Sequence, residues 1–361
     1  MPFTPEQLSY GARAAIDYFL RNDPIDQYNV GHPLFNKVVA GKKDYVGALQ
    51  YVVEQLRFQN DSNFQSYFGD QQVSYNRKRT LNQAKFIWGS FHDGFGLNED
   101  ELAQNGITMT DDRSSSPSDA EKIQLTNLLS ENLASLKLGF VENFDIMLHR
   151  SGAQSSTDIP GLDNLVSLTP STGTVGGIDT SVAANSWWRN RATTGLGTGT
   201  LIPEMEAAWR FCIRVGGQPP DFILAGETMI DKYRTEAQTT SSGGILRQVI
   251  VGDGSGVKKG QTLDVGVGNA VSTGLYFKGV EIIWDPNFVA LDVLDAPATA
   301  WVKRMYFLNT KHLQLRPISG HWMVSRKPPR VYDRYVHYTG LTAKAAFTTT
   351  KRNAHAVMAL T

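Results

Sequence analysis

Two glycine clusters come nearest to a chemical motif in this chain, because closely spaced backbone amides can bind phosphate. The run GDGSGVK at 252–258 lacks the spacing and the Gly-Lys-Ser/Thr ending of a P-loop. The run GLGTG at 195–199 is not the dinucleotide pattern that closes a strand and opens a helix. Turns therefore explain these glycines better than nucleotide binding does.

Metal and hydrolase chemistry find little support in the remaining residues. The seven histidines include no pair at the i, i+4 spacing of a helical zinc site, and Cys212 is the single cysteine. No Gly-x-Ser-x-Gly pentapeptide marks a nucleophile elbow. The sequence predicts no catalytic residue, no metal ligand and no cofactor. A hydrolase or nucleotide-binding enzyme that uses the glycine loops stays as an alternative.

Two other clusters are candidates for contact between subunits. Arg77, Lys78 and Arg79 form a basic run that can contact phosphate or acidic neighbours, although a solvated surface is its ordinary interpretation. Trp187 and Trp188 are adjacent, and adjacent side chains of a strand point to opposite faces. We expect one tryptophan to be buried within the subunit and the other to lie near a neighbouring chain. Burial of both within the subunit is the alternative.

The element best marked by the sequence is a long helix over residues 119–149. Apolar residues recur there at intervals of three and four, which predicts one apolar stripe. Ser118 and Glu121 form a capping box at its start, and Gly152 is a left-handed stop beyond its end. His149 lies in the last turn, where positive charge complements exposed carbonyl groups.

Shorter elements lie on both sides of this helix. The pattern predicts helices over 4–22, 203–215 and 227–237, a two-stranded excursion within 45–95, and strands over 222–225, 279–284 and 304–308. The last 40 residues alternate as strands do. The whole is a mixed α+β chain.

The composition limits which partners the protein can bind and which cellular compartment it fits. The 361 residues include 35 basic and 35 acidic side chains, so any DNA contact must be local. One cysteine excludes an internal disulfide framework and fits a reducing cytosol. The N-terminus lacks a signal-peptide pattern, and no stretch approaches 18 consecutive apolar residues. We expect a soluble protein that is not exported by a signal peptide.

The order of these elements resembles the major capsid proteins of tailed bacteriophages, which have the Hong Kong 97-type fold. The resemblance is most specific over residues 161–190, which read GLDNLVSLTPSTGTVGGID and end in SWWRN, with weaker support at 306–311 (YFLNTK). It implies an α+β fold with an N-terminal arm (1–44) and an extended two-stranded loop (45–115). A peripheral domain with a spine helix (116–200), an axial domain (201–320) and a peripheral return (321–361) would follow.

The same resemblance implies a structural role without catalysis. Members of the family assemble as hexamers and pentamers into an icosahedral shell that encloses double-stranded DNA. The implied partners are other copies of the chain, a separate scaffolding protein, a portal and, as an open option, a decoration protein, with no membrane. The implied location is the virion capsid, assembled in the host bacterial cytoplasm. An encapsulin-like nanocompartment, which shares the fold but encloses enzymes, is the close alternative.

Overall fold

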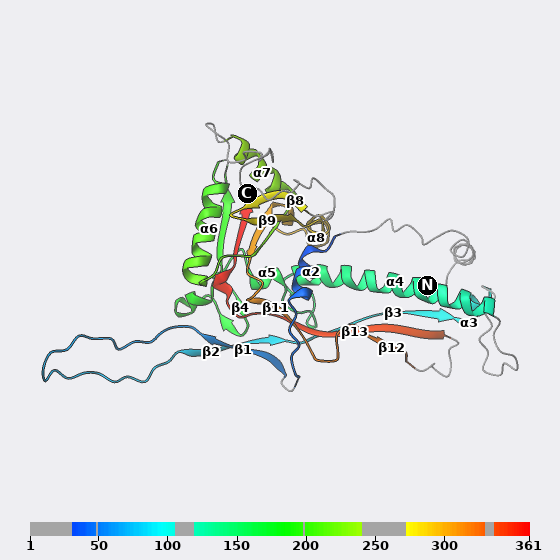
Figure 1. Ribbon diagram of the computed structural model, residues 1–361, viewed down its shortest axis with the longest axis horizontal. Helices are drawn as coiled ribbons and strands as arrows, with labels where there is room; N and C mark the ends of the chain where they lie inside the picture. The colour runs from blue at the N-terminus through cyan, green and yellow to red at the C-terminus, as the bar shows by residue number, and fades with distance from the viewer. Residues whose placement is uncertain (1–30, 48–49, 105–118, 198, 240–271, 329–335) are drawn as a thin grey trace, which may run out of the picture. The chain divides into compact units, whose positions relative to one another are not determined.

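The computed structural model describes residues 31–47, 50–104, 119–197, 199–239, 272–328 and 336–361 (Figure 1). Its residues divide into two units. The first unit comprises the described parts of 90–144 and 318–344, and the second those of 31–89, 145–317 and 345–361. The division falls within helix α4 (Asp119–His149) and strand β13 (Val336–Thr349), so each of these elements contributes to both units.

A six-stranded mixed sheet forms the centre of the second unit, in the order β6-β14-β10-β7-β9-β8 (Figure 1). Its strands are β6 (Arg191–Leu196), β14 (Ala356–Leu360), β10 (Arg304–Leu308), β7 (Phe222–Ala225), β9 (Val280–Trp284) and β8 (Ser272–Phe277). The C-terminal strand β14 runs parallel to β6 and antiparallel to β10. The strands predicted over 222–225, 279–284 and 304–308 are confirmed as β7, β9 and β10.

Helices α6 (Leu201–Gly216) and α7 (Glu227–Thr239) cover one face of this sheet, as the predicted helices over 203–215 and 227–237 require. Met205, Trp209 and Cys212 of α6 pack in one apolar cluster with alternate residues of the strands. Burial raises the pKa of the Cys212 thiol to about 12, so this side chain packs as an inert apolar group.

Aromatic side chains cover the opposite face of the sheet. The ring of His149, in the last turn of α4, lies 5.5 Å from that of Phe288 in helix α8 (Asn287–Asp295). Phe288 lies 5.6 Å from Trp301 in the short helix η2 (Trp301–Lys303), and Trp301 lies 6.2 Å from Tyr306 in β10. Ring edges and faces meet at favourable distances throughout this cluster.

Residues 161–190 contain α5 (Leu162–Leu165), the hairpin of β4 (Thr174–Val175) with β5 (Ile178–Asp179), and the 3-10 helix η1 (Ala183–Trp188). A Cβ atom at Gly161 would collide with the carbonyl oxygens of Arg150 and Leu148, so only glycine fits at the end of α4. Trp188 is buried, and its indole nitrogen donates to the carbonyl oxygen of Val175 at 3.0 Å. The sequence analysis was wrong in placing the tryptophan pair in a strand.

A buried arginine ties this segment to the C-terminal strands. Arg352, in η3 (Arg352–Ala354), is fully buried and has no carboxylate partner among the described residues. Its Nε donates to the carbonyl oxygen of Leu165 at 2.7 Å and its Nη1 to that of Trp188 at 3.2 Å. Its Nη2 donates to Oδ1 of Asn190 at 3.1 Å. Burial lowers the pKa of Arg352 to about 10, which leaves the guanidinium charged and held by neutral oxygens.

Strands β3 (Gly89–Asn98) and β12 (Val324–Arg326) both pair with β13. Within the first unit, the α4 residue Phe144 packs edge-on against Phe91 of β3 at 5.1 Å and against Trp322 at 5.4 Å. Helix α3 (Glu99–Gln104) follows β3, and Leu97 and Leu102 form a small buried cluster there. In this unit α4 therefore packs on the sheet through aromatic side chains.

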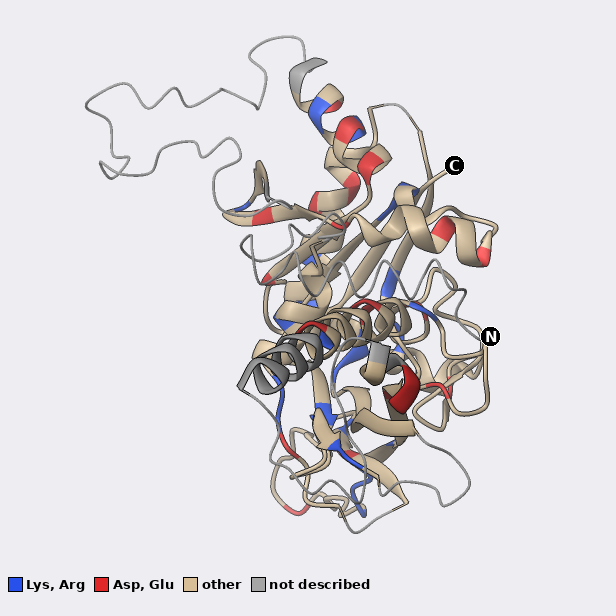
Figure 2. Cartoon of the chain, turned by 90° about the vertical axis from the view of Figure 1, so that its right-hand side faces the viewer, with Lys and Arg blue, Asp and Glu red and all other residues tan. Residues whose placement is uncertain are grey.

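The long helix is confirmed with the predicted bounds, and Gly152 has the left-handed φ of +78° expected of a stop. The predicted helix over 4–22 and the Ser118 cap lie outside the described residues. Among the residues that the structure describes, no helix combines the length and apolar character needed to cross a bilayer. Acidic and basic residues are interspersed along the described chain (Figure 2).

Replacement of Arg352 by alanine would remove the donors for the carbonyl oxygens of Leu165 and Trp188. Since each buried acceptor left unpaired costs about 1–3 kcal/mol, we expect the free energy of unfolding to fall by about 3 kcal/mol or more, measured by urea denaturation. Arg352→Lys should also destabilise, because an ammonium lacks the planar fork. The exposed Arg214→Ala is the control and should change stability by less than about 0.5 kcal/mol. A comparable small change for Arg352→Ala would contradict this role.

Candidate assembly surfaces and a buried charge cluster

The first candidate surface is a hairpin that we call the finger, residues 51–87. Strand β1 (Tyr51–Arg57) pairs antiparallel with β2 (Leu81–Ile87), which confirms the predicted two-stranded excursion. One face of the pair is buried through Val52, Leu56, Ala84 and Phe86. Phe86 packs against Gly176 in the β4–β5 turn, and Glu54 pairs with Arg316 at 3.0 Å. The base of the finger is thereby anchored in the second unit.

Beyond this base the two legs of the finger have no strand ladder. Residues 58–80, although they lie within the predicted two-stranded excursion, are not paired as strands. Side chains connect the legs instead: Nε2 of Gln59 donates to the carbonyl oxygen of Arg79 at 2.9 Å, and Ser74 Oγ donates to Oε1 of Gln65 at 3.3 Å. Gly69, with φ +57°, makes the turn at the tip.

The tip of the finger exposes aromatic side chains to an unusual degree. Phe64 is 95% exposed, Tyr75 91%, Phe68 87% and Tyr67 67%. Soluble monomers rarely leave several large apolar side chains together without cover. The finger therefore has the composition of a surface that another molecule covers.

Arg77, Lys78 and Arg79 lie on the second leg of the finger. All three side chains are exposed, and none forms an ion pair with a residue that the structure describes. Their charges are therefore available to an acidic or phosphate-bearing neighbour. The basic run and the aromatic tip therefore belong to one structural element.

The two tryptophans differ in their surroundings. Trp188 is 1% exposed, whereas Trp187 is half-buried between Trp188 at 5.5 Å and Phe58 at 5.5 Å. Nδ2 of Asn353 donates to the carbonyl oxygen of Trp187 at 3.1 Å. Trp187 thus packs at the root of the finger, where it also presents a partly open ring to the outside.

Sequence reasoning missed a second apolar surface, on α8. Val289, Val293 and Leu294 are 45%, 82% and 56% exposed. Six of the nine residues of this helix are apolar, and large apolar side chains that are exposed together in a single chain are often covered by another molecule. Its outward apolar residues were the available signal, but the segment was not recognised as a helix.

Sequence reasoning also missed a buried charge cluster in the second unit. His149 is fully buried, and its Nε2 lies 2.8 Å from Oδ2 of Asp285. Its Nδ1 lies 2.8 Å from the carbonyl oxygen of Asp145. The Asp145 carboxylate accepts from the backbone N–H of Phe35 at 3.0 Å. These residues connect α4 and α8 to helix α2 (Pro33–Ala40).

The same carboxylate meets two further polar side chains. Oδ2 of Asp145 accepts from Nδ2 of Asn287 at 2.5 Å and lies 3.3 Å from Nδ1 of His32. Asn287 is buried at the start of α8, and its Nδ2 also lies 3.0 Å from Nδ1 of His32. Groups separated by more than 100 positions in the chain are therefore joined around one carboxylate.

Charge explains the geometry of this cluster. Burial by itself lowers the pKa of His149, but the neighbouring Asp285 and Asp145 carboxylates outweigh it and raise the pKa to about 9. Both ring nitrogens then donate, which matches two acceptors at 2.8 Å. The sequence analysis expected His149 to complement exposed carbonyls of a helix end. The structure confirms one such contact, with the carbonyl of Asp145, and shows in addition that the ring is fully buried and pairs with the Asp285 carboxylate.

Asp145, His149 and Asp285 also offer three potential metal-ligand atoms within 4.8 Å of one another. A ring nitrogen of His149 must be free of its proton to bind a metal ion. Here both ring nitrogens already meet oxygen acceptors, and one acceptor is a backbone carbonyl. The arrangement fits a buried ion pair better than a metal centre.

The glycine loop at 195–199 leads to a helix end that is already occupied. The Glu236 carboxylate accepts from the backbone N–H of Gly199 at 2.8 Å and from that of Leu201 at 3.0 Å, at the start of α6. A side-chain carboxylate therefore takes the place that a phosphate would need. The second glycine cluster, at 252–258, lies outside the described residues.

The raised pKa of His149 makes stability depend on alkaline pH. The ion pair stabilises fully below the unfolded pKa of about 6.5 and its contribution of about 3 kcal/mol is lost as pH rises through about 9. Urea denaturation of the wild type between pH 6 and 9.5 should show this loss of stability. In His149→Gln most of the pH dependence should be absent. The exposed His321→Gln is the control and should keep the wild-type profile. Equal profiles for His149→Gln and wild type would refute the assignment.

Comparison with known proteins adds the fold. No family model matches the chain, and no curated protein matches it. Solved structures match along nearly its whole length. The capsid asymmetric unit of cyanophage A-1(L) has a TM-score of 0.58 and 13% identity, covering 94% of this chain and 95% of that one. The capsid of the Myoviridae phage XM1 has a TM-score of 0.54 and 12% identity, covering 94% of this chain and 95% of that one. The structure from Gordonia phage Cozz has a TM-score of 0.54 and 12% identity, covering 94% of this chain and 89% of that one. The chain therefore has the α+β fold of phage capsid subunits, as the resemblance implied.

Proposed function

We propose that this protein is the structural major capsid protein of a tailed phage. It assembles as hexamers and pentamers into an icosahedral shell around double-stranded DNA. The observation that carries the proposal is the finger, whose aromatic tip is 67–95% exposed in the single chain. A closed symmetric shell supplies each copy with a neighbour to cover that surface. The capsid fold supports the same conclusion.

The parts of the shell subunit follow the order given by the resemblance. We assign residues 1–44 to an N-terminal arm and 45–115 to the extended loop that contains the finger. Residues 116–200 and 321–361 form the peripheral domain, and α4 is its spine helix. Residues 201–320 form the axial domain. Arg77, Lys78, Arg79 and the partly open Trp187 contact neighbouring subunits, whereas Trp188 serves the interior of its own subunit.

A scaffolding protein, a portal and DNA are the further partners of such a shell, and the virion assembled in the host cytoplasm is its location. A decoration protein is an optional further partner. The subunit works by packing and not by catalysis. The occupied helix end at Glu236 argues against the nucleotide-binding alternative at the loop 195–199. An encapsulin-like compartment would differ by the cargo it encloses.

Electron microscopy of the protein, expressed alone and with a candidate scaffolding partner, tests the proposal. We expect closed particles several hundred ångströms across, or sheets of hexamers. DNA and a portal in native particles distinguish a phage capsid from an enzyme-filled compartment. A stable monomer under both conditions would oppose the proposal.

The finger supplies a sharper test. Phe64→Ser combined with Phe68→Ser removes two exposed aromatic rings, so we expect unchanged thermal unfolding but loss of particles by electron microscopy and sedimentation. Burial of one such ring in a subunit contact stabilises that contact by about 1.5–3 kcal/mol. Ser66→Ala with Gln72→Ala, in the same segment, is the matched control and should still assemble. Particle yields equal to the control would remove the finger from the interface.

A further inference from the structure

A row of basic side chains crosses the second unit at the end of α6. Arg210, Arg214 and Gly217 recur at intervals of four and three, so they share one side of this helix and its cap. Arg210 and Arg214 are exposed. A Cβ atom at Gly217 would lie 3.4 Å from Nζ of Lys351. The Lys351 ammonium therefore continues the row beyond the helix.

The row reaches the turn between β10 and β11 (Leu313–Pro317). The backbone N–H of Thr350, next to Lys351, donates to the carbonyl oxygen of His312 at 2.9 Å. Exposed Lys311 precedes His312 in this turn. Burial lowers the pKa of His312, and the charges of Lys351 and Lys311 lower it further. Asp221 raises it by less than either lysine lowers it, so positive charge dominates around this ring.

We use the name basic band for four side chains of this row: Arg210, Arg214, Lys311 and Lys351. None of the four forms an ion pair with a residue that the structure describes. The acidic side chains near them are already engaged. Glu206 of α6 pairs with Lys278 at 2.7 Å, and Asp221 accepts from the backbone N–H of Thr310 at 2.7 Å. The charge of the band is therefore available to another molecule.

A structural role accounts for only half of the basic band. Arg214 and Lys351 lie at the C-terminal end of α6, where positive charge complements the exposed carbonyl groups. Arg210 lies one turn earlier, and Lys311 belongs to a different turn of the chain. Neither is needed to complement the helix end. The four cations together fit an external polyanion.

The rest of the chain makes this band a local exception. Its 35 basic and 35 acidic residues cancel, so attraction to a polyanion must come from a local group of cations. Exposed Arg and Lys side chains are the usual donors to phosphate oxygens, and such contacts carry no sequence preference. Double-stranded DNA has about one negative charge per 1.7 Å of its axis, so one duplex can meet all four cations.

We propose that the basic band binds the phosphate backbone of double-stranded DNA without reading its sequence. This inference rests on the proposed shell function, and it names the surface of the subunit that contacts the enclosed DNA. The contact is electrostatic, so it weakens steeply as salt rises.

Replacement of all four cations of the band by glutamine tests the contact. Binding of a fluorescent 20-base-pair DNA duplex is measured between about 50 and 200 mM salt, with the full-length chain held below the concentration at which shells form. Each phosphate contact contributes about −0.9 to the slope of log K against log salt, so we expect the slope to lose about 3–4 in magnitude. Affinity at about 50 mM salt should fall at least tenfold. Duplexes rich in A·T and in G·C should behave alike.

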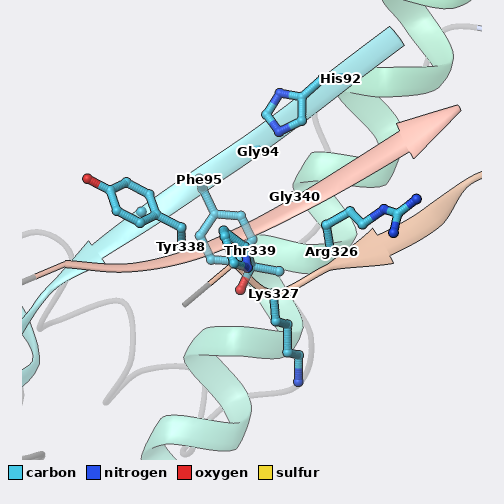
Figure 3. A pocket seen from close by; sticks show the side chains of 10 residues that line it. His92, Gly94, Phe95, Arg326, Lys327, Tyr338, Thr339 and Gly340 are labelled. Atoms are coloured by element: carbon cyan, nitrogen blue, oxygen red, sulfur yellow. The ribbon is translucent and has the colours of Figure 1, made fainter. Parts of the chain in front are cut away.

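A matched control removes the same charge from the first unit. Arg326 and Lys327 line a groove there together with His92, Phe95 and Tyr338 (Figure 3). The control replaces four exposed cations of this unit by glutamine: Lys137, Arg326, Lys327 and Lys344. It should keep the wild-type salt slope. An equal loss of slope in the control would assign binding to net charge and overturn the proposal.

Thermal unfolding checks that both variants fold as the wild type does. If the fourfold variant does not fold, Lys311→Gln alone, in an exposed turn, should still reduce the magnitude of the slope by about 1. An unchanged slope would overturn the proposal. Polyglutamate is the second probe. If the band variant weakened polyglutamate binding but not duplex binding, the partner would be an acidic protein and the proposal would be wrong.

Electron microscopy separates this inference from the shell function. The band variant should form shells as the wild type does. Normal shells with unchanged DNA binding would overturn the inference and leave the shell function standing. Loss of shells with an unchanged salt slope would make the band a contact between subunits, which also overturns the inference. Failure of wild-type chains to form shells would instead oppose the shell function itself.

Discussion

The fold depends on burying the charged end of a long helix. The last turn of α4 must enter the core to cover the second face of the six-stranded sheet, and it brings Asp145 and His149 with it. An unpaired charge in such a place would be strongly unfavourable. Asp285 supplies the counter-charge at 2.8 Å, and the backbone of α2 supplies a donor to Asp145. One electrostatic requirement therefore fixes where α2, α4 and α8 meet.

Local signals predicted the elements of this core but not its cluster. The bounds of α4 and the left-handed Gly152 follow from patterns within a few residues of the chain. His149 and Asp285 are separated by 136 positions, and the His149 side chain alone gave a plausible surface role. Helix α8 was not predicted because it is only nine residues long, which is too short for its period to stand out in the sequence. Pairing over long sequence separations is set by the whole fold, and a single sequence holds no direct signal for it.

For the finger and the tryptophan pair, too, the sequence predicted local features but not the full arrangement. The pattern predicted a two-stranded segment, which the pairing of β1 with β2 confirms. The Arg77–Arg79 run is exposed, and its contact with a neighbouring subunit stays a prediction. The tryptophan pair was misplaced because strand alternation and a tight 3-10 turn both separate neighbouring side chains. In η1 the pair divides by depth: Trp188 donates to Val175, and Trp187 packs on Phe58.

Residues 161–190 are held in place largely through their backbone. Arg352, Trp188 and Asn190 all bond to main-chain oxygens in this segment. Every residue type offers a carbonyl oxygen, so the acceptor side places no demand on the sequence. The demand falls on the few donors and on Gly161, where a Cβ does not fit. Apolar positions elsewhere tolerate exchange among residues of similar volume. A few donors and one glycine therefore determine the conformation of this segment.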